Sequence, residues 1–352
     1  AFLWVGSIFY ITNNQLRYMF RSREVALSNI GNTIVSTAAG FACVFWFRLG
    51  VAGVFLGQAT GLLLFSLISI YLARGLYRPV FNWGVLSRML RYSVPLVPGT
   101  VAFFAMQYVD RYILSDLRGL TDVGIYGMGA RIASLLNLFL MGFQGAWFPH
   151  VMNSFREPEA RTKFVTVFRI YLFGTMSILM VLSLFGQEVL LLLTTPAFAG
   201  GFIVVPLLVF GAVMASIASY FSYGIQIAEK NHYRMFLNLV ALVANVTLNL
   251  LLIPLFGVVG AALANALCFT VLAVGSMWAS QRLYRVPYSW PGILGAIAAA
   301  VLVSHSVIFW HPAVTAWTIL NKVLLAIIAT GLVAYTLRVP IRLSTWRRVA
   351  GL

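Results

Sequence analysis

The sequence predicts an all-α polytopic membrane protein, and three observations lead to that fold class. Of the 352 residues, 61% are hydrophobic and only 9% are charged, whereas soluble globular domains carry about 25% charged residues. The hydrophobic residues form runs of about 20, the length that an α-helix needs to cross the hydrocarbon core of a bilayer. Most of the basic residues fall between these runs.

Eleven such runs follow one another along the chain, separated mostly by short loops that leave no room for a soluble domain. They cover residues 1–20, 25–47, 51–73, 92–115, 122–149, 163–186, 200–228, 234–254, 257–280, 291–310 and 315–337.

The basic residues indicate how these runs are oriented. Alternate loops hold 18 of the 24 Lys and Arg residues, whereas the opposite loops hold only Arg48 and Arg118. Cytoplasmic loops of membrane proteins are enriched in Lys and Arg, so we expect a cytoplasmic C-terminus. This topology also explains the net charge of +16 without a nucleic-acid partner. The first run begins within an apolar stretch and has no basic n-region or cleavage site, which favours an N-terminally truncated chain over a signal peptide.

The residues that build metal or disulfide sites are few. Cys43 and Cys268 each lie inside an apolar run, and the four His residues show no metal-ligand spacing. We therefore expect no disulfide and no cofactor.

An internal repeat relates two parts of the chain. At an offset of 207 residues, the stretch from Leu49, "LGVAGVFLGQATG", aligns with "FGVVGAALANALC" from Phe256. Both copies lead to a basic loop on the same side, so the repeat is parallel, as in transporters built from two lobes. Gly53, Gly57 and Gly61 lie four residues apart, and we interpret them as a helix-packing face rather than as a functional site.

The repeat and the loops predict the domain organisation. Residues 1–73 form the C-terminal part of a first lobe with three helices, the first incomplete, and residues 74–91 form an interlobe cytoplasmic linker. Residues 92–285 form a second lobe of six helices, and residues 286–352 add two helices and a basic cytoplasmic tail. A short interfacial helix and turn are expected in "QEVLLLLTTPAFAGG" from Gln187.

Two longer stretches resemble a known family. From Arg88 to Leu135, "RMLRYSVPLVPGTVAFFAMQYVDRYILSDLRGLTDVGIYGMGARIASL" resembles the start of the second lobe in bacterial polysaccharide-unit flippases. These are the O-antigen and exopolysaccharide translocases of the multidrug/oligosaccharidyl-lipid/polysaccharide exporter superfamily. "NVTLNLLLIPLFGVVGAALANAL" (residues 245–267) resembles the family's asparagine-rich helix, Pro-x-x-Gly turn and glycine-alanine helix.

The resemblance implies a two-lobed, multidrug-and-toxin-extrusion-like helix bundle in the bacterial inner membrane. Family members have twelve to fourteen helices, so the first three and part of the fourth would be missing here. The implied function is translocation of an undecaprenyl-diphosphate-linked oligosaccharide from the cytoplasmic to the periplasmic leaflet for O-antigen, capsule or exopolysaccharide synthesis. Alternating access, coupling to H⁺ or Na⁺ and other inner-membrane polysaccharide assembly proteins as partners are also implied.

Three other functions fit the sequence less well or differ only in the substrate. A peptidoglycan-precursor flippase differs only in the sugar, and a multidrug cation antiporter would favour buried carboxylates, whereas the runs hold more Arg than acid. A glycan polymerase or ligase would carry a large outer loop and clustered acid–base residues. We therefore expect a transporter and not an enzyme.

Charged residues inside the runs are the candidate site. Arg131, Arg111 and Arg169 are candidate ligands of a diphosphate, because a guanidinium group binds phosphate oxygens through two parallel hydrogen bonds. Asp110 is the candidate ion-coupling residue. The alternatives are that Asp110 pairs with Arg111 or Arg131 to join two helices, and that Arg169 reaches the cytoplasmic interface.

Uncharged polar residues extend the candidate site. Gln107, Asp110, Arg111 and Ser115 fall on one side of a helix at the spacing i, i+3, i+4 and i+8, which predicts a cavity-facing stripe. Amides are suitable partners for sugar hydroxyls. The candidate sugar contacts are Gln107, Asn137, Gln144, Asn245 and Asn249. For the asparagines, interhelical hydrogen bonding is the alternative.

Overall fold

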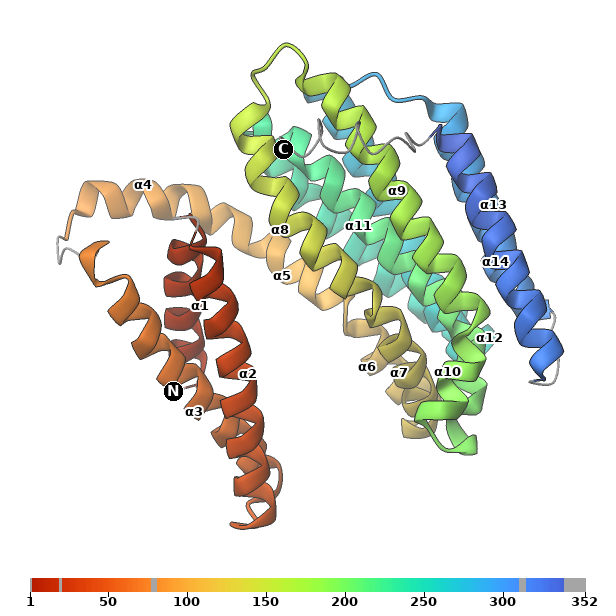
Figure 1. The fold of residues 1–352 in the computed structure, drawn as a ribbon, viewed down its shortest axis with the longest axis horizontal. Helices are drawn as coiled ribbons and strands as arrows, with labels where there is room; N and C mark the ends of the chain where they lie inside the picture. Colours follow the sequence, from red (N-terminus) through yellow and green to blue (C-terminus); the bar gives the residue numbers. More distant parts are fainter. Residues whose placement is uncertain (1, 19–20, 77–80, 310–314, 339–352) are drawn as a thin grey trace. The chain divides into compact units, whose positions relative to one another are not determined.

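The computed structural model describes residues 2–18, 21–76, 81–309 and 315–338, and all regular elements within them are helices (Figure 1). The basic tail after residue 338 and part of the predicted linker, 77–80, lie outside the described residues. The chain divides into two compact units, Ala1–Leu86 and Ser87–Leu352. The division falls inside the predicted linker 74–91, on helix α4 (Trp83–Ser93).

The first unit contains α1 (Phe2–Tyr18), α2 (Ser22–Phe45) and α3 (Gly50–Leu72). Glycines on one face of α3 let its backbone approach α2 closely. A Cβ atom at Gly57 would lie 2.8 Å from the carbonyl oxygen of Ser36, and one at Gly61 would lie 2.9 Å from Oδ1 of Asn32. These distances are shorter than a carbon contact allows, which confirms the packing role predicted for this glycine face.

Two glycines aligned by the predicted repeat share an unusual backbone conformation. Gly50 has φ +52° and Gly257 has φ +56°. Positive φ values favour glycine, because a Cβ atom would be strained in this backbone conformation. Gly50 begins α3, and Gly257 interrupts α12 (His232–Leu283) three residues after Pro254. The interruption separates the two predicted runs 234–254 and 257–280, and the shared conformation is consistent with the repeat.

The second unit holds the remaining elements. They are η2 (Val94–Leu96), α5 (Val97–Met106), α6 (Val109–Arg118), α7 (Leu120–Ser134), α8 (Leu136–Ser154), α9 (Ala160–Leu184), α10 (Gly186–Leu193), η3 (Pro196–Val204), α11 (Val205–Ile227), α12, α13 (Trp290–Phe309) and α14 (Ala316–Leu337). The short α10 and η3 coincide with the interfacial helix and turn predicted after Gln187.

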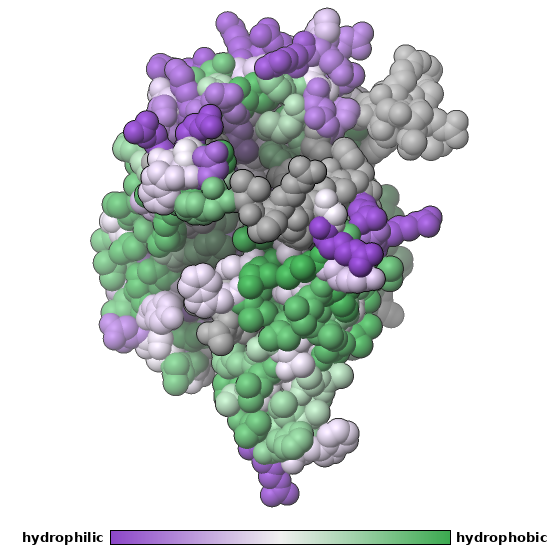
Figure 2. Space-filling model, turned by 90° about the vertical axis from the view of Figure 1, so that its left-hand side faces the viewer, coloured by the Kyte–Doolittle hydropathy of each residue, from purple (hydrophilic) through white to green (hydrophobic). Residues whose placement is uncertain are grey.

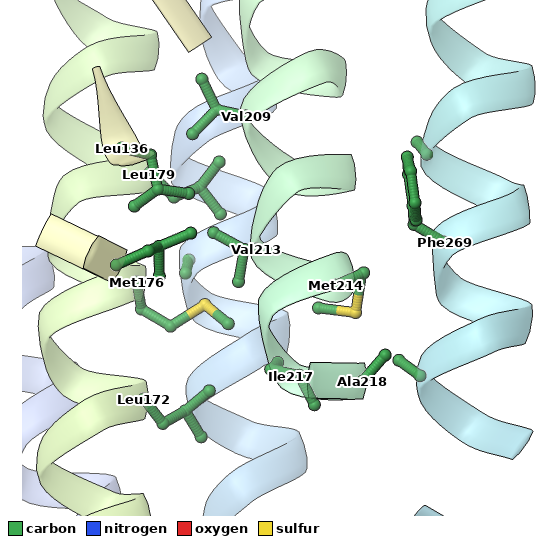
Figure 3. Close-up of a cluster of buried hydrophobic side chains, with 14 of the residues drawn as sticks. Leu136, Leu172, Met176, Leu179, Val209, Val213, Met214, Ile217, Ala218 and Phe269 are labelled. Carbon is green, nitrogen blue, oxygen red and sulfur yellow. The ribbon is translucent and has the colours of Figure 1, made fainter. Parts of the chain in front are cut away.

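The core of the second unit lies among α8, α9, α11 and α12, as Figure 3 shows. Leu172, Met176 and Leu179 on α9 point toward Val209 and Val213 on α11, and all five are fully enclosed. Helices α13 and α14 pack against α9 (Figure 1). This continuous apolar packing positions α7 and α10, which carry the candidate site.

The predicted run 92–115 is not a continuous helix. The run 92–115 breaks after Met106, where Tyr108 leaves the helical conformation with φ −131° and ψ −22°, and α6 restarts at Val109. The polar stripe through Gln107 and Asp110 therefore does not form. Gln107 is exposed whereas Asp110 is buried, because the break rotates α6 relative to α5.

Within the described residues, six helices are long and apolar enough to cross a membrane. Helix occupies each of the eleven predicted runs, but α12 joins two of them. The run 92–115 is divided between α5 and α6, and the run 122–149 between α7 and α8. The number of crossings thus stays a prediction. The middle of the face visible in Figure 2 is largely hydrophobic. Leu192, Phe236 and Leu302 are exposed apolar residues of the second unit. Such a surface fits a lipid environment.

Candidate functional site

The candidate site in the second unit is a cavity between α7 and the α10–η3 segment. Its volume is about 620 Å³, and Arg131 is the charged residue among those that line it. The lining residues are Val123, Gly124, Gly127, Met128, Arg131, Leu192, Leu193, Thr194, Thr195 and Phe198. A cationic group, two hydroxyls and a group of apolar side chains therefore face the same space.

Close backbone packing builds this cavity. A Cβ atom at Gly129 would lie 3.0 Å from the carbonyl oxygen of Gly201, and one at Gly201 would lie 2.8 Å from that of Ile125. These glycines let η3 lie against α7. Thr194 and Thr195 adopt extended conformations between α10 and η3, and the Thr194 hydroxyl donates a 2.8 Å hydrogen bond to the carbonyl oxygen of Leu190. The turn thus holds both threonines at the cavity wall.

The Arg131 side chain is available for an anionic ligand. It is exposed, and its Nη1 atom lies 3.2 Å from the Met128 sulfur, a weak acceptor. No ion pair involving Arg131 occurs among the described residues. Its guanidinium lies far along α7, eleven residues from Leu120, or about 16 Å at 1.5 Å per residue.

The other two candidate arginines do not line this cavity. Arg111 lies with its guanidinium carbon 5.5 Å from the centre of the Tyr108 ring. Arg169 donates a 3.2 Å hydrogen bond from Nη2 to the Ser289 hydroxyl, between α12 and α13. In each residue Nε is buried without a partner among the described residues. The structure therefore does not gather Arg111, Arg131 and Arg169 into one cluster.

Asp110 lies in a buried polar network rather than in a salt bridge. The Tyr126 hydroxyl donates a hydrogen bond to Oδ2 of Asp110, and Nδ2 of Asn265 donates a second one at 3.4 Å. The Arg111 backbone amide donates to Oδ1 at 2.8 Å. Asp110 is 1% exposed, and within the described part of the chain it pairs with neither Arg111 nor Arg131. The salt-bridge alternative is wrong because the break after Met106 turns Asp110 toward α7 and α12.

The remaining polar candidates occupy different environments. Gln107 and Asn137 are exposed and Gln144 is half-buried. Asn245 and Asn249 are fully enclosed by protein. Asn249 donates from Nδ2 to the backbone oxygen of Asn245 at 2.8 Å, and Asn245 donates to the Cys268 sulfur at 3.2 Å. The second bond joins the two halves of α12, the arrangement expected of the interhelical alternative.

Several residues of the site were not predicted. Tyr126 and Asn265 contact Asp110 across 16 and 155 residues of sequence, a separation that leaves no local signal. The α10–η3 segment was predicted as an interfacial element but not as a cavity wall. No group of three or more His, Cys, Asp or Glu that could hold a metal ion occurs in the described ranges.

Comparison with known proteins gives one family match. Residues 1–155 match the family model described as Polysaccharide biosynthesis protein. The match covers the first unit and the start of the second unit. With six candidate spans among the described residues, the chain is a multi-pass membrane protein. No curated protein sequence matches it.

A solved structure shares the fold of this chain. The lipid II flippase MurJ, in an inward closed conformation, matches with a TM-score of 0.68 and 15% sequence identity, over 97% of this chain and 72% of the MurJ chain. The identity is low, so the similarity supports the all-helical architecture and does not by itself assign a substrate.

Proposed function

We propose that this protein is a flippase that moves an undecaprenyl-diphosphate-linked oligosaccharide from the cytoplasmic to the periplasmic leaflet for cell-surface polysaccharide synthesis. The match of residues 1–155 to a polysaccharide biosynthesis family supports a role in that process, and the MurJ-like fold supports transport of a lipid-linked saccharide rather than an enzymatic reaction. The observation that carries the proposal is the exposed Arg131 guanidinium in a cavity of about 620 Å³.

The chemistry of the substrate requires such a residue. A diphosphate that leaves water loses its hydration, so its charge must be met by donors inside the protein. A guanidinium group supplies forked donors that match phosphate oxygens. Arg131 serves as the main diphosphate contact, and Arg111 and Arg169 act at other stages of passage. The exposed amides of Gln107 and Asn137, together with Gln144, contact the saccharide.

The two units correspond to two lobes whose relative movement gives alternating access. Asp110 couples this movement to H⁺ or Na⁺, because it is an acid enclosed between α6, α7 and α12. The protein lies in the bacterial inner membrane with its C-terminus in the cytoplasm.

A peptidoglycan precursor is the second candidate substrate, favoured by the similarity to a lipid II flippase. Because both substrates carry the same prenyl diphosphate, Arg131 has the same role in each. Competition between the two lipid-linked saccharides for transport by the purified protein separates the candidates: only the true substrate competes at low concentration.

The proposal is tested in cells that lack this protein and carry it back on a plasmid. Arg131→Ala should leave the amount of membrane-inserted protein unchanged and make lipid-linked saccharide accumulate on the cytoplasmic leaflet. Arg156→Ala is the matched control, because Arg156 lies outside the helices, beside the Phe155 ring. Normal surface polysaccharide at normal protein level in the Arg131→Ala strain would contradict the proposal.

A further inference from the structure

A buried ion pair joins α10 to α14. Nζ of Lys322 lies 2.6 Å from Oε1 of Glu188, and their side chains are only 2% and 12% exposed. Oε2 of Glu188 is buried and has no hydrogen-bond partner among the described residues. Leu184 at the end of α9 and Ala326 on α14, each four residues from one of the charges in the sequence, belong to a small apolar cluster.

Stability alone does not explain this pair. Removing two charges from water costs about as much as their attraction returns, so a buried ion pair is often no more stable than apolar side chains of similar volume. The directional contact between Glu188 and Lys322 instead selects one alignment of α10 along α14. Here it fixes the first turn of α10, where the helix dipole also favours a carboxylate.

The same short helix forms a wall of the Arg131 cavity. Leu192 lies four residues after Glu188, one turn along α10, and Leu192 and Leu193 line the cavity while remaining 85% and 72% exposed. Few contacts hold these two side chains, so the position of the wall depends on how the rest of α10 is held. Lys322 reaches α10 from α14, which lies beyond the predicted repeat.

We infer that Lys322 and Glu188 are positioning residues that set the α10 wall of the Arg131 cavity, through which the α13–α14 hairpin controls binding of a prenyl diphosphate. The choice of ligand in this inference rests on the proposed function, whereas the claim that the ion pair positions α10 does not. Loss of the ion pair lets α10 move away from α7, which separates the apolar side chains of Leu192 and Leu193 from the Arg131 guanidinium. A ligand with both a diphosphate and an apolar chain then loses simultaneous contact with the two.

The test compares variants of the full chain in lipid nanodiscs. Lys322→Met leaves Glu188 unpaired and is prone to misfold, so the decisive variant is the double substitution Glu188→Gln/Lys322→Met, which leaves no buried charge. Lys163→Met is the matched control, because it breaks an ion pair of similar length, 2.7 Å to Glu157, whose side chains are 30% and 49% exposed.

Two measurements are made on each variant. Hydrogen exchange followed by mass spectrometry reports opening of residues 186–193, and titration with farnesyl diphosphate reports the Kd of the cavity. In the double variant we expect at least tenfold faster exchange in α10, unchanged exchange in α11, and a Kd at least tenfold higher than in the parent protein. Lys163→Met should change neither quantity.

The outcomes separate the inference from the proposed function. A double variant with parental exchange and parental Kd would overturn the inference, as would uniformly faster exchange across the unit with an unchanged Kd. If the parent protein binds neither farnesyl diphosphate nor inorganic pyrophosphate, the proposed substrate is wrong, while exchange in α10 still tests the positioning role. Equal binding of both compounds would also overturn the inference, because its apolar wall should favour the prenyl chain.

Discussion

Replacement of Asp110 should separate its structural role from the role in ion coupling that we propose for it. The carboxylate accepts hydrogen bonds from the Tyr126 hydroxyl and the Asn265 amide, and it is 1% exposed. Asp110→Ala leaves both donors buried without an acceptor. Each such group costs about 1–3 kcal/mol, and the Asn265 bond is long at 3.4 Å. We therefore expect a loss of about 2–4 kcal/mol in the free energy of unfolding.

Asp110→Asn should be far less harmful to stability. Its side-chain oxygen can still accept from Tyr126, and its amide group would then face the Arg111 backbone N–H. That N–H keeps a second acceptor, the Tyr108 carbonyl oxygen at 3.1 Å. The expected loss is about 1 kcal/mol or less, whereas the negative charge that could bind H⁺ or Na⁺ is gone.

Thermal unfolding of the purified protein in detergent measures the first effect. A loss of 1 kcal/mol lowers Tm by about 2–4 °C in domains of 150–250 residues, so Asp110→Ala should fall by about 5–15 °C. Asp116→Ala, at an exposed acid on the same helix, should be unchanged. Equal Tm values for Asp110→Ala and the wild type would refute the network. Ion-stimulated transport by the folded Asp110→Asn variant would refute the coupling role.

Two further predictions concern packing and a helix end. Gly57→Val should destabilise the first unit by about 1–3 kcal/mol, because the added atoms meet the α2 backbone near Ser36. Gly331→Ala is the control, because a Cβ atom there meets nothing within 4 Å. Equal thermal stability of the two variants would contradict the close packing of α2 and α3. Arg118→Ala should lose about 1–2 kcal/mol in the free energy of unfolding, because Nη2 of Arg118 donates to the carbonyl oxygens of Pro254 at 2.7 Å and Ile253 at 3.4 Å. We expect faster amide hydrogen exchange confined to the region around Gly257. Unchanged exchange there would contradict this capping role.

The helices were predictable because their signal is local. Each apolar run is long, and Pro254 and Gly257 mark the interruption of α12 three residues apart in the sequence. The close approach of α2 and α3 was likewise predictable, because glycines four residues apart always share a helix face. Composition and spacing thus determined where the helices lie and which face of α3 packs.

The polar interior was not predictable to the same degree. The stretch "FAMQYVD" (residues 104–110) contains no proline or glycine. The helix nevertheless breaks after Met106, and the break changes the direction of the Asp110 side chain. The partner of Asp110 on α12 is 155 residues away, and the pairing of Lys322 with Glu188 spans 134 residues. Such contacts depend on how helices pack together, which a single sequence does not encode as a local pattern.

Transport by the purified protein tests the central claim most directly. The protein is reconstituted into lipid vesicles with a fluorescent prenyl-diphosphate-linked oligosaccharide, and an impermeant quencher reports its movement between leaflets. Wild-type protein should accelerate movement well beyond protein-free vesicles, with Arg131→Ala at least tenfold slower and Arg131→Lys intermediate, because a lysine keeps the charge without the forked donors. Equal rates for wild type and Arg131→Ala, or no acceleration by the wild type, would contradict the account.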